Sequence, residues 1–196
     1  MIEKKARQIA GFLVQNGADP QNEAVYAYSL ECLLNLLFSD LLLFSAALAL
    51  HRFREILIWT VSYTLLRVRI GGHHASTHIR CILSGTLIGI LSLPMNRIWE
   101  MFPFLIPVLA VVLFLDLIFL APVEHERHPI SEATRRRSKL LGALTGCLGF
   151  FLAYLLRDNP YIPANSIYSG FACALLLALL ASVLHLINGT QTSSVS

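Results

Sequence analysis

Apolar residues fill six long runs of this chain, separated by short polar stretches. The runs cover residues 30–50, 55–66, 81–94, 102–122, 140–156 and 166–188. A membrane-spanning helix needs about 20 apolar residues, because each adds about 1.5 Å to a path of roughly 30 Å. The first, fourth and sixth runs are long enough, the fifth is marginal, and the second and third are short. The pattern predicts an all-α polytopic membrane bundle of about six hydrophobic helical segments, of which four to six span the bilayer.

An amphipathic unit precedes the first apolar run. Apolar residues recur there at helical spacing, with charged residues between them and a glycine after them: Ile2, Ala6, Ile9, Ala10, Leu13 and Gly17. This spacing predicts an amphipathic helix within residues 1–17. Such a helix either lies on the membrane surface or bundle, or receives a helix of a substrate. The spacing alone leaves both roles open.

The composition places the chain among membrane proteins. Of its 196 residues 56% are hydrophobic and 14% charged, against about 25% charged residues in average soluble domains. No stripe of basic residues interleaved with aromatic residues indicates nucleic-acid binding. Residues 1–30 are polar and contain no signal-peptide core. We expect one membrane-embedded domain over residues 1–196, surrounded by the lipid bilayer and without a nucleic-acid partner.

Basic residues near the ends of the runs predict the orientation. They gather at the N-terminus, in the stretch 67–80 and in a basic loop predicted for residues 123–139. Because lysine and arginine favour the cytoplasmic side, all three are expected there, with six spans and both termini inside the plasma membrane. His51, Arg52 and Arg54 conflict with this topology, since it places them outside. A re-entrant first hairpin would remove the conflict.

Two acidic residues and four cysteines lie in or beside the apolar runs. Asp40 and Asp116 are costly to bury as charges. We therefore expect each to face the bundle interior beside a polar partner or to take up a proton, in a structural contact or in positioning a reacting group. Cys32, Cys147 and Cys173 have apolar neighbours and are expected to be small packing residues, whereas Cys81 has polar neighbours.

The polar stretch around Cys81 combines a candidate nucleophile with candidate bases. It reads Arg67-Val-Arg-Ile-Gly71-Gly72-His73-His74-Ala-Ser-Thr-His78-Ile-Arg80-Cys81. A histidine can deprotonate a cysteine, and a helix N-terminus or nearby cations favour the thiolate. The two glycines predict a helix break, after which Ser76 or Thr77 caps a helix with Cys81 in its first or second turn. His74 lies about 10 Å of helical rise from Cys81 and His78 much closer, so spacing alone leaves both as candidate bases.

Two other interpretations of this stretch stay open. His74, His78 and Cys81 have the i, i+4, i+7 spacing of a zinc-binding helix face. However, the chain has no His-Glu-x-x-His motif and no obvious fourth ligand nearby, so we expect no metal ion or other cofactor. The second interpretation is a set of polar residues that lies at the cytoplasmic membrane interface without a catalytic role.

At these residues the chain resembles the accessory gene regulator B (AgrB) family of membrane peptidases. The family pattern is an arginine, a Gly-Gly-x-His-Ala segment and a cysteine seven residues after the histidine, here Arg67, Gly71 to Ala75 and Cys81. A second similar element runs from Ala121-Pro122 through His128-Pro129 to Glu132 and a basic cluster: Arg135, Arg136, Arg137 and Lys139. The length and the six apolar runs fit as well, so the resemblance covers nearly the whole chain.

The resemblance implies a cysteine endopeptidase, with base His74 and nucleophile Cys81, that acts at the cytoplasmic face. Its substrate would be a short propeptide with an amphipathic helix and an acidic tail, which the basic cluster would attract. Cleavage would leave a thioester on Cys81, and an internal cysteine of the peptide would close a thiolactone ring, the quorum-sensing signal. Arg67 and Gly72 match positions that the family needs, and a homodimer is implied.

Further roles at the site follow from the chemistry of the same segment. Backbone N–H groups after the break at Gly71 and Gly72, or the Arg67 guanidinium, would stabilise an oxyanion. His78 is an additional proton carrier, and the extra His73 stands at a variable position of the pattern. The alternative function is export of a small peptide, although the chain shows no internal repeat of the transporter kind. A metal-dependent membrane protease and a non-enzymatic membrane partner are further alternatives.

Overall fold

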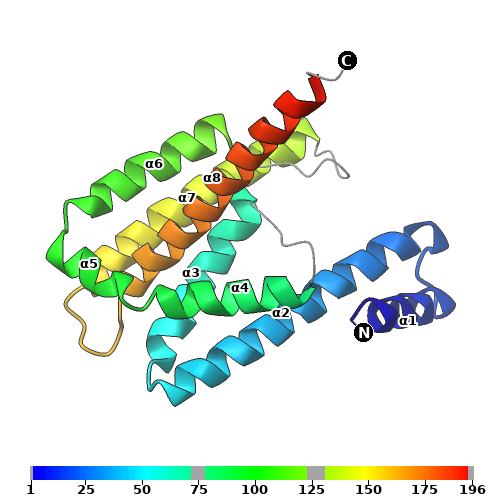
Figure 1. The fold of residues 1–196 in the computed structure, drawn as a ribbon, viewed down its shortest axis with the longest axis horizontal. Coiled ribbons are helices and arrows are strands. Elements are labelled where there is room, and N and C mark those ends of the chain that lie inside the picture. Colours follow the sequence, from blue (N-terminus) through cyan, green and yellow to red (C-terminus); the bar gives the residue numbers. More distant parts are fainter. Residues whose placement is uncertain (1, 72–77, 123–130, 194–196) are drawn as a thin grey trace.

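The computed structural model describes residues 2–71, 78–122 and 131–193 as a bundle of helices without strands. The side chains of Ile2, His78 and residues 185–193 are outside this description. The elements are α1 (Ile2–Gln15), η1 (Pro20–Asn22), α2 (Glu23–Ala49), α3 (Phe53–Ile70), α4 (His78–Leu91), α5 (Met95–Met101), α6 (Leu105–Phe119), α7 (Glu132–Leu156) and α8 (Asn165–Ser193). This is the predicted all-α membrane bundle (Figure 1).

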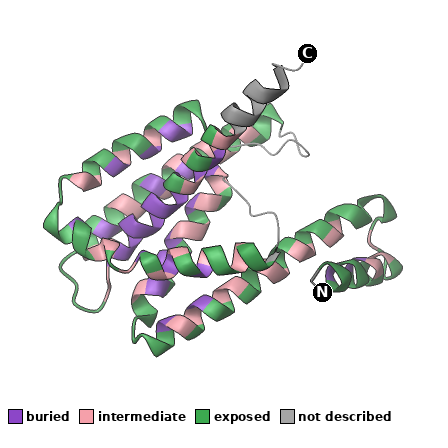
Figure 2. Ribbon diagram, in the orientation of Figure 1, coloured by how far each residue is buried: buried purple, intermediate pink, exposed green. Residues whose placement is uncertain are grey.

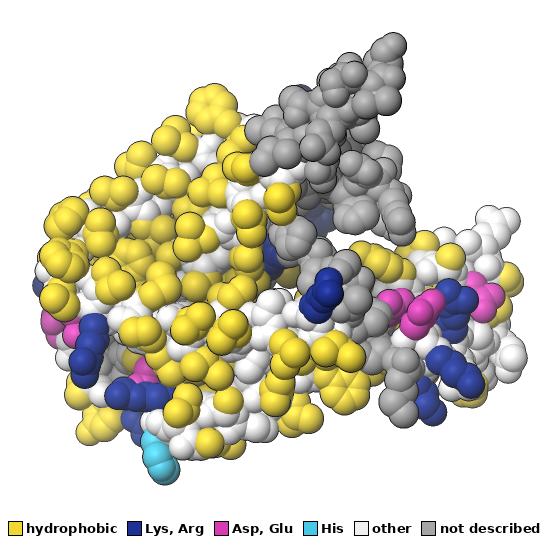
Figure 3. Space-filling view, in the orientation of Figure 1, with side chains coloured by type: hydrophobic (Ala, Val, Ile, Leu, Met, Phe, Trp, Pro, Cys, Tyr) yellow, Lys and Arg dark blue, Asp and Glu magenta, His cyan; other side chains and the backbone are white. Residues whose placement is uncertain are grey.

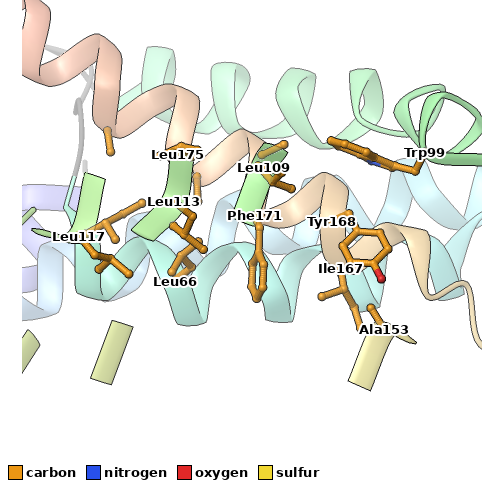
Figure 4. Packing of buried hydrophobic residues seen from close by; sticks show 14 of the residues in the cluster. Leu66, Trp99, Leu109, Leu113, Leu117, Ala153, Ile167, Tyr168, Phe171 and Leu175 are labelled. Atoms are coloured by element: carbon orange, nitrogen blue, oxygen red, sulfur yellow. The ribbon is translucent and has the colours of Figure 1, made fainter. Parts of the chain in front are cut away.

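Helix α8 is the central element of the bundle. It packs most extensively against α3 and also contacts α5, α6 and α7. Most of its first half is buried, as Figure 2 shows. Its side chains, among them Phe171 and Leu175, join Leu66 of α3 and Leu113 of α6 in the main hydrophobic core (Figure 4). Helices α3, α5, α6 and α7 therefore take their positions from α8.

Small residues allow the closest helix contacts. A Cβ added at Gly170 of α8 would lie 2.9 Å from the carbonyl oxygen of Trp59 and 3.0 Å from the amide nitrogen of Tyr63. The backbones of α3 and α8 thus approach directly, which a larger residue would prevent. Two Gly-x-x-x-Gly spacings act similarly within the chain. Gly85 and Gly89 of α4 face α2, and a second pair, Gly142 and Gly146 of α7, faces α6.

A buried polar network fixes the short helix α5 against α8. Asn96 donates to Ser166 Oγ at 3.0 Å and accepts from Ser169 Oγ at 2.7 Å. The indole N–H of Trp99 donates to the same Ser169 hydroxyl at 2.9 Å. Because buried polar groups are costly when unpaired, this network specifies one position of α5 on α8. No apolar periodicity in the sequence indicates it.

The predicted segments correspond to helices, but two of their boundaries are wrong. Within the described residues, four stretches are long and apolar enough to cross a membrane: Pro20–Ala49, Ile79–Met101, Glu132–Leu156 and Asn165–Leu184. The third run, predicted to be short, gains length because α5 continues it. The fourth, predicted to be long enough, forms only the 15-residue helix α6, since Pro103 and Phe104 precede its start and Leu120 ends it.

A further correction concerns the basic loop that the sequence predicts over residues 123–139. Helix α7 begins at Glu132, so the basic cluster lies on its first turns. The side chain of Ser131 caps this helix by accepting the N–H of Thr134, and Glu132 suits the positive end of the helix dipole. The polar composition of residues 131–139 predicted a loop, but the Ser131 cap allows a helix to begin there. Residues 123–130 lie outside the described residues.

The predictions for the embedded acids and cysteines had mixed outcomes. Asp116 is buried as expected, but neither of its carboxylate oxygens has a hydrogen-bond partner among the described residues. Asp40 is only half-buried. Cys173 packs in the core, whereas Cys32 and Cys147 are exposed on the outer surface of the bundle. All four cysteines are free thiols.

The helices alternate in direction between two ends of the bundle (Figure 1). The end where α3 finishes and α4 and α7 begin is called the Cys81 end. The opposite end, with the turns 50–52 and 157–164, is called the Arg54 end. Helix α8 finishes toward the Cys81 end, and α1 packs on the N-terminal half of α2, where Ala6 and Ala10 are fully buried. Ile9, Phe12 and Leu13 of α1 remain exposed.

The α3–α8 contact predicts a position-specific cost for a single methyl group. Gly170→Ala should destabilise the purified protein by roughly 1–3 kcal/mol, because two backbones must separate to accept the new Cβ. Gly11→Ala is the matched control, since its Cβ would meet nothing closer than 3.7 Å. Thermal unfolding in detergent measures both. Equal melting temperatures for Gly170→Ala and the wild type would contradict the close contact.

Candidate active site

A series of side-chain contacts along one face of α3 leads from the core to the Cys81 end. Trp59, Tyr63, Arg67 and Gly71 follow one another at intervals of four residues, so they share one helix face. The rings of Trp59 and Tyr63 stack with centroids 4.7 Å apart and planes 8° apart. The Arg67 guanidinium lies close enough to the Tyr63 hydroxyl to interact with it. Arg67 then donates from Nη1 to the carbonyl oxygen of Gly71.

Gly71 ends α3 at the predicted break. Its φ of 77° lies in the left-handed region that favours glycine, and its N–H donates to the carbonyl of Arg67 at 3.0 Å. Arg67 thus binds Gly71 through both its backbone carbonyl and its guanidinium. The last residue before the Gly72–Thr77 segment is therefore fixed from two directions.

Cys81 lies in the first turn of α4, as predicted. The helix begins at His78, and the thiol-bearing residue is partly exposed. The first turn carries the positive end of the helix dipole, and Arg80 adds a further positive charge. The structure therefore brings Arg67, Gly71 and Cys81 to one end of the bundle.

Three predicted site residues fall wholly or partly outside the residues that the structure describes. Gly72 and His74 lie outside the described residues, and so does the side chain of His78. The choice between His74 and His78 as base stays a prediction, as does the oxyanion role of the Gly72 amide. The zinc interpretation combines both histidines with Cys81, and it also stays untested.

The basic cluster of α7 lies at the same end of the bundle. A Cβ at Gly142 would lie 3.5 Å from the Cβ of Arg69, which places the third turn of α7, just after the basic cluster, beside the end of α3. Lys139 donates to the carbonyl oxygen of Ile118 at 2.6 Å and so binds the C-terminus of α6. Arg135 is half-buried, whereas Arg136 and Arg137 are exposed. Lys139 therefore has a structural contact, and the two exposed arginines are available to a ligand.

Comparison with known proteins decides the family. Residues 6–187 match the family described as accessory gene regulator B. The chain belongs to the AgrB family. Membership gives it a part in processing the propeptide of an agr quorum-sensing system, and its apolar helices make it a multi-pass membrane protein. No curated protein and no solved structure matches the chain.

Tyr63 is a residue of this AgrB-family site that the sequence motif does not indicate. It lies outside the Gly-Gly-x-His-Ala…Cys pattern, in the middle of an apolar run. Its spacing of four residues from both Trp59 and Arg67 is the one sequence signal that places it on the same helix face. Tyr63 reaches the site only through Arg67, so a positioning role for it is an expectation.

The contacts of Arg67 predict that its shape, and not only its charge, is needed. Arg67→Lys should lower propeptide processing at least about tenfold, since an ammonium group lacks the fork that contacts Tyr63 and Gly71 together. Arg69→Lys is the matched control on the same helix. Processing is measured by co-expression with the propeptide, normalised to the amount of membrane-inserted protein. Full activity of Arg67→Lys would show that only the positive charge matters.

Proposed function

We propose that this protein is a cysteine endopeptidase that cleaves a short signal propeptide at the cytoplasmic face and leaves it ready for ring closure. The observation that carries the proposal is the place of Cys81 in the first turn of α4, beside the Tyr63–Arg67–Gly71 contacts. A partly exposed thiol at a positive helix end is suited to nucleophilic attack, unlike the buried Cys173.

The first step of the proposed reaction forms a thioester. His74 takes the proton of the Cys81 thiol, and the thiolate attacks the carbonyl carbon of the scissile peptide bond. Arg67 or the backbone N–H groups near Gly71 stabilise the oxyanion that forms. The carbon–nitrogen bond then breaks, and His74 returns the proton to the amine of the leaving C-terminal tail. The N-terminal part of the propeptide remains on Cys81 as an acyl group.

The second step exchanges one thioester for another. An internal cysteine of the bound peptide loses its thiol proton and attacks the acyl carbon, and Cys81 leaves and regains a proton. Because the bond formed and the bond broken are both thioesters, the step needs positioning more than driving force. Restricted access of water protects the acyl group from hydrolysis. The product is a cyclic thiolactone peptide.

The distribution of charge supports a cytoplasmic Cys81 end. Four of the 15 lysine and arginine residues, Arg52, Arg54, Arg97 and Arg157, lie at the Arg54 end. Those of α1, α4 and α7, together with Arg67 and Arg69 of α3, lie toward the Cys81 end. This bias favours a cytoplasmic Cys81 end with both termini inside. This topology requires the shorter helices α3 and α6 to cross the membrane together with the four candidate spans.

Substitution of the two reacting residues tests the peptidase. Co-expressed with the propeptide, Cys81→Ala and His74→Ala should each reduce cleavage to less than about a hundredth of the wild-type amount, because neither attack nor proton transfer can be replaced. Cys147→Ala, which removes an exposed free thiol, is the matched control and should cleave normally.

The same assay separates the alternative functions. Cleavage that persists in Cys81→Ala would end the peptidase proposal and leave export or a structural role. Loss of wild-type cleavage in purified protein on treatment with a chelator, with recovery on adding Zn²⁺, would replace the thiol mechanism by the metal-dependent one.

The exposed arginines of α7 are proposed to attract the acidic tail of the propeptide. Arg136→Glu combined with Arg137→Glu should lower processing at low ionic strength by about tenfold and make it less sensitive to added salt, since like charges then face the tail. Accessibility labelling of the loops must first show an unchanged topology. Processing that stays at the wild-type level would show that these cations serve topology alone.

A further inference from the structure

A polar cavity lies at the Arg54 end, at the opposite end of the bundle from Cys81. It has a volume of about 610 Å³ and lies between the turn after α2, the α4–α5 junction and the α7–α8 turn. Four arginines and two glutamates line it: Arg52, Arg54, Arg97, Arg157, Glu55 and Glu100. The lining therefore has two more positive than negative charges. Figure 3 shows basic and acidic side chains gathered at this end, beside an apolar surface.

The acidic residues of the cavity already have partners. Glu55 pairs with Arg52 at 2.9 Å, and Glu100 accepts a hydrogen bond from Asn165 at 3.1 Å. Arg157 pairs with the exposed Asp158 and lies over the ring of Tyr154. By contrast, Arg54 and Arg97 have no ion pair or hydrogen bond with the rest of the described chain. Two guanidinium groups thus remain to bind an anion.

The place of the cavity at the ends of two candidate spans puts it near the lipid headgroups of a surrounding membrane. Helix α7 ends at Leu156 and α8 begins at Asn165, so the cavity lies where two candidate spans leave the membrane. Exposed aromatic side chains surround this end, among them Tyr154, Tyr161, Phe102 and Phe104. Tyrosine and other aromatic rings collect at the membrane–water interface, where one edge is apolar and the other hydrated. An occupant of the cavity is therefore next to phospholipid headgroups.

We propose that this cavity binds the phosphate headgroup of an anionic phospholipid. Arg54 and Arg97 supply planar donors that match phosphate oxygens, and their charge favours an anionic lipid over a zwitterionic one. The volume falls in the range of small-ligand sites, roughly 300–1,000 Å³. The exposed apolar residues Leu91 and Met101, on either side of the α4–α5 junction, give the acyl chains a surface beside the cavity.

The proposed lipid site gives a role to the arginines at the Arg54 end, which the peptidase reaction does not use. Arginines at the end opposite Cys81 work against the charge bias that orients the protein. A lipid phosphate that neutralises two of them lowers that cost and anchors the α2–α3 and α7–α8 turns to the same leaflet. The proposal is independent of the thioester chemistry and of the propeptide.

Lipid retention by the full-length protein tests the proposal. The protein is purified in detergent with equal amounts of phosphatidylglycerol and phosphatidylcholine, and bound lipid is counted by native mass spectrometry. The wild type should retain phosphatidylglycerol, and Arg54→Gln with Arg97→Gln should retain it about tenfold less. Lys4→Gln with Lys5→Gln makes the same change of charge on α1 and should retain it normally.

The other outcomes overturn the proposal. Equal loss in the Lys4/Lys5 variant would show general charge attraction without a site. Displacement of the lipid by inorganic phosphate at an equal concentration would assign the cavity to a free anion, and stronger displacement by an acidic peptide would assign it to a peptide. If the Gln variant fails to fold, Arg54→Lys with Arg97→Lys keeps the charge. Retention of phosphatidylglycerol by that variant should lie between zero and the wild-type amount, and an unchanged amount would exclude recognition by the guanidinium fork.

Discussion

The direct contact of the α3 and α8 backbones at Gly170 determines how the rest of the molecule is arranged. Without a side chain at this position, the carbonyl of Trp59 and the amide of Tyr63 lie against α8. In a membrane, where lipid tails are as apolar as leucine, such close packing is a main source of helix association. The contact fixes Trp59 and Tyr63, which begin the series of side-chain contacts that reaches Arg67 and Gly71. The geometry of the Cys81 end thus depends on packing in the middle of the bundle.

The exterior of the bundle follows from the same physical setting. Many large apolar side chains are exposed on α2, α4, α6 and α7, which would be unfavourable in water and is expected beside lipid. The interior instead uses glycine contacts and the Asn96–Ser169 network to define positions. The two ends have different chemistry. One holds a thiol and a proposed base, and the other holds cations without reactive groups.

The sequence predicts the elements well and their contacts poorly. Apolar run length located the helices, and the two glycines located the end of α3, because backbone freedom is a local property. The start of α7 was misplaced because the Ser131 cap outweighed a polar composition. Tyr63, Gly170 and the α5 network were not predictable by run length, since each depends on which helix lies opposite. The His74 assignment rests on the family pattern, because spacing alone does not separate it from His78.

A trapped acyl-enzyme tests the central claim most directly. Wild-type protein would be incubated with a propeptide whose internal cysteine is replaced by alanine, so that ring closure is blocked after cleavage. Mass spectrometry of the digested protein should find the N-terminal propeptide fragment on the peptide that contains Cys81, and hydroxylamine should remove it. Cleavage of this propeptide without any adduct, or with an adduct on Cys32, Cys147 or Cys173 instead, would contradict the account.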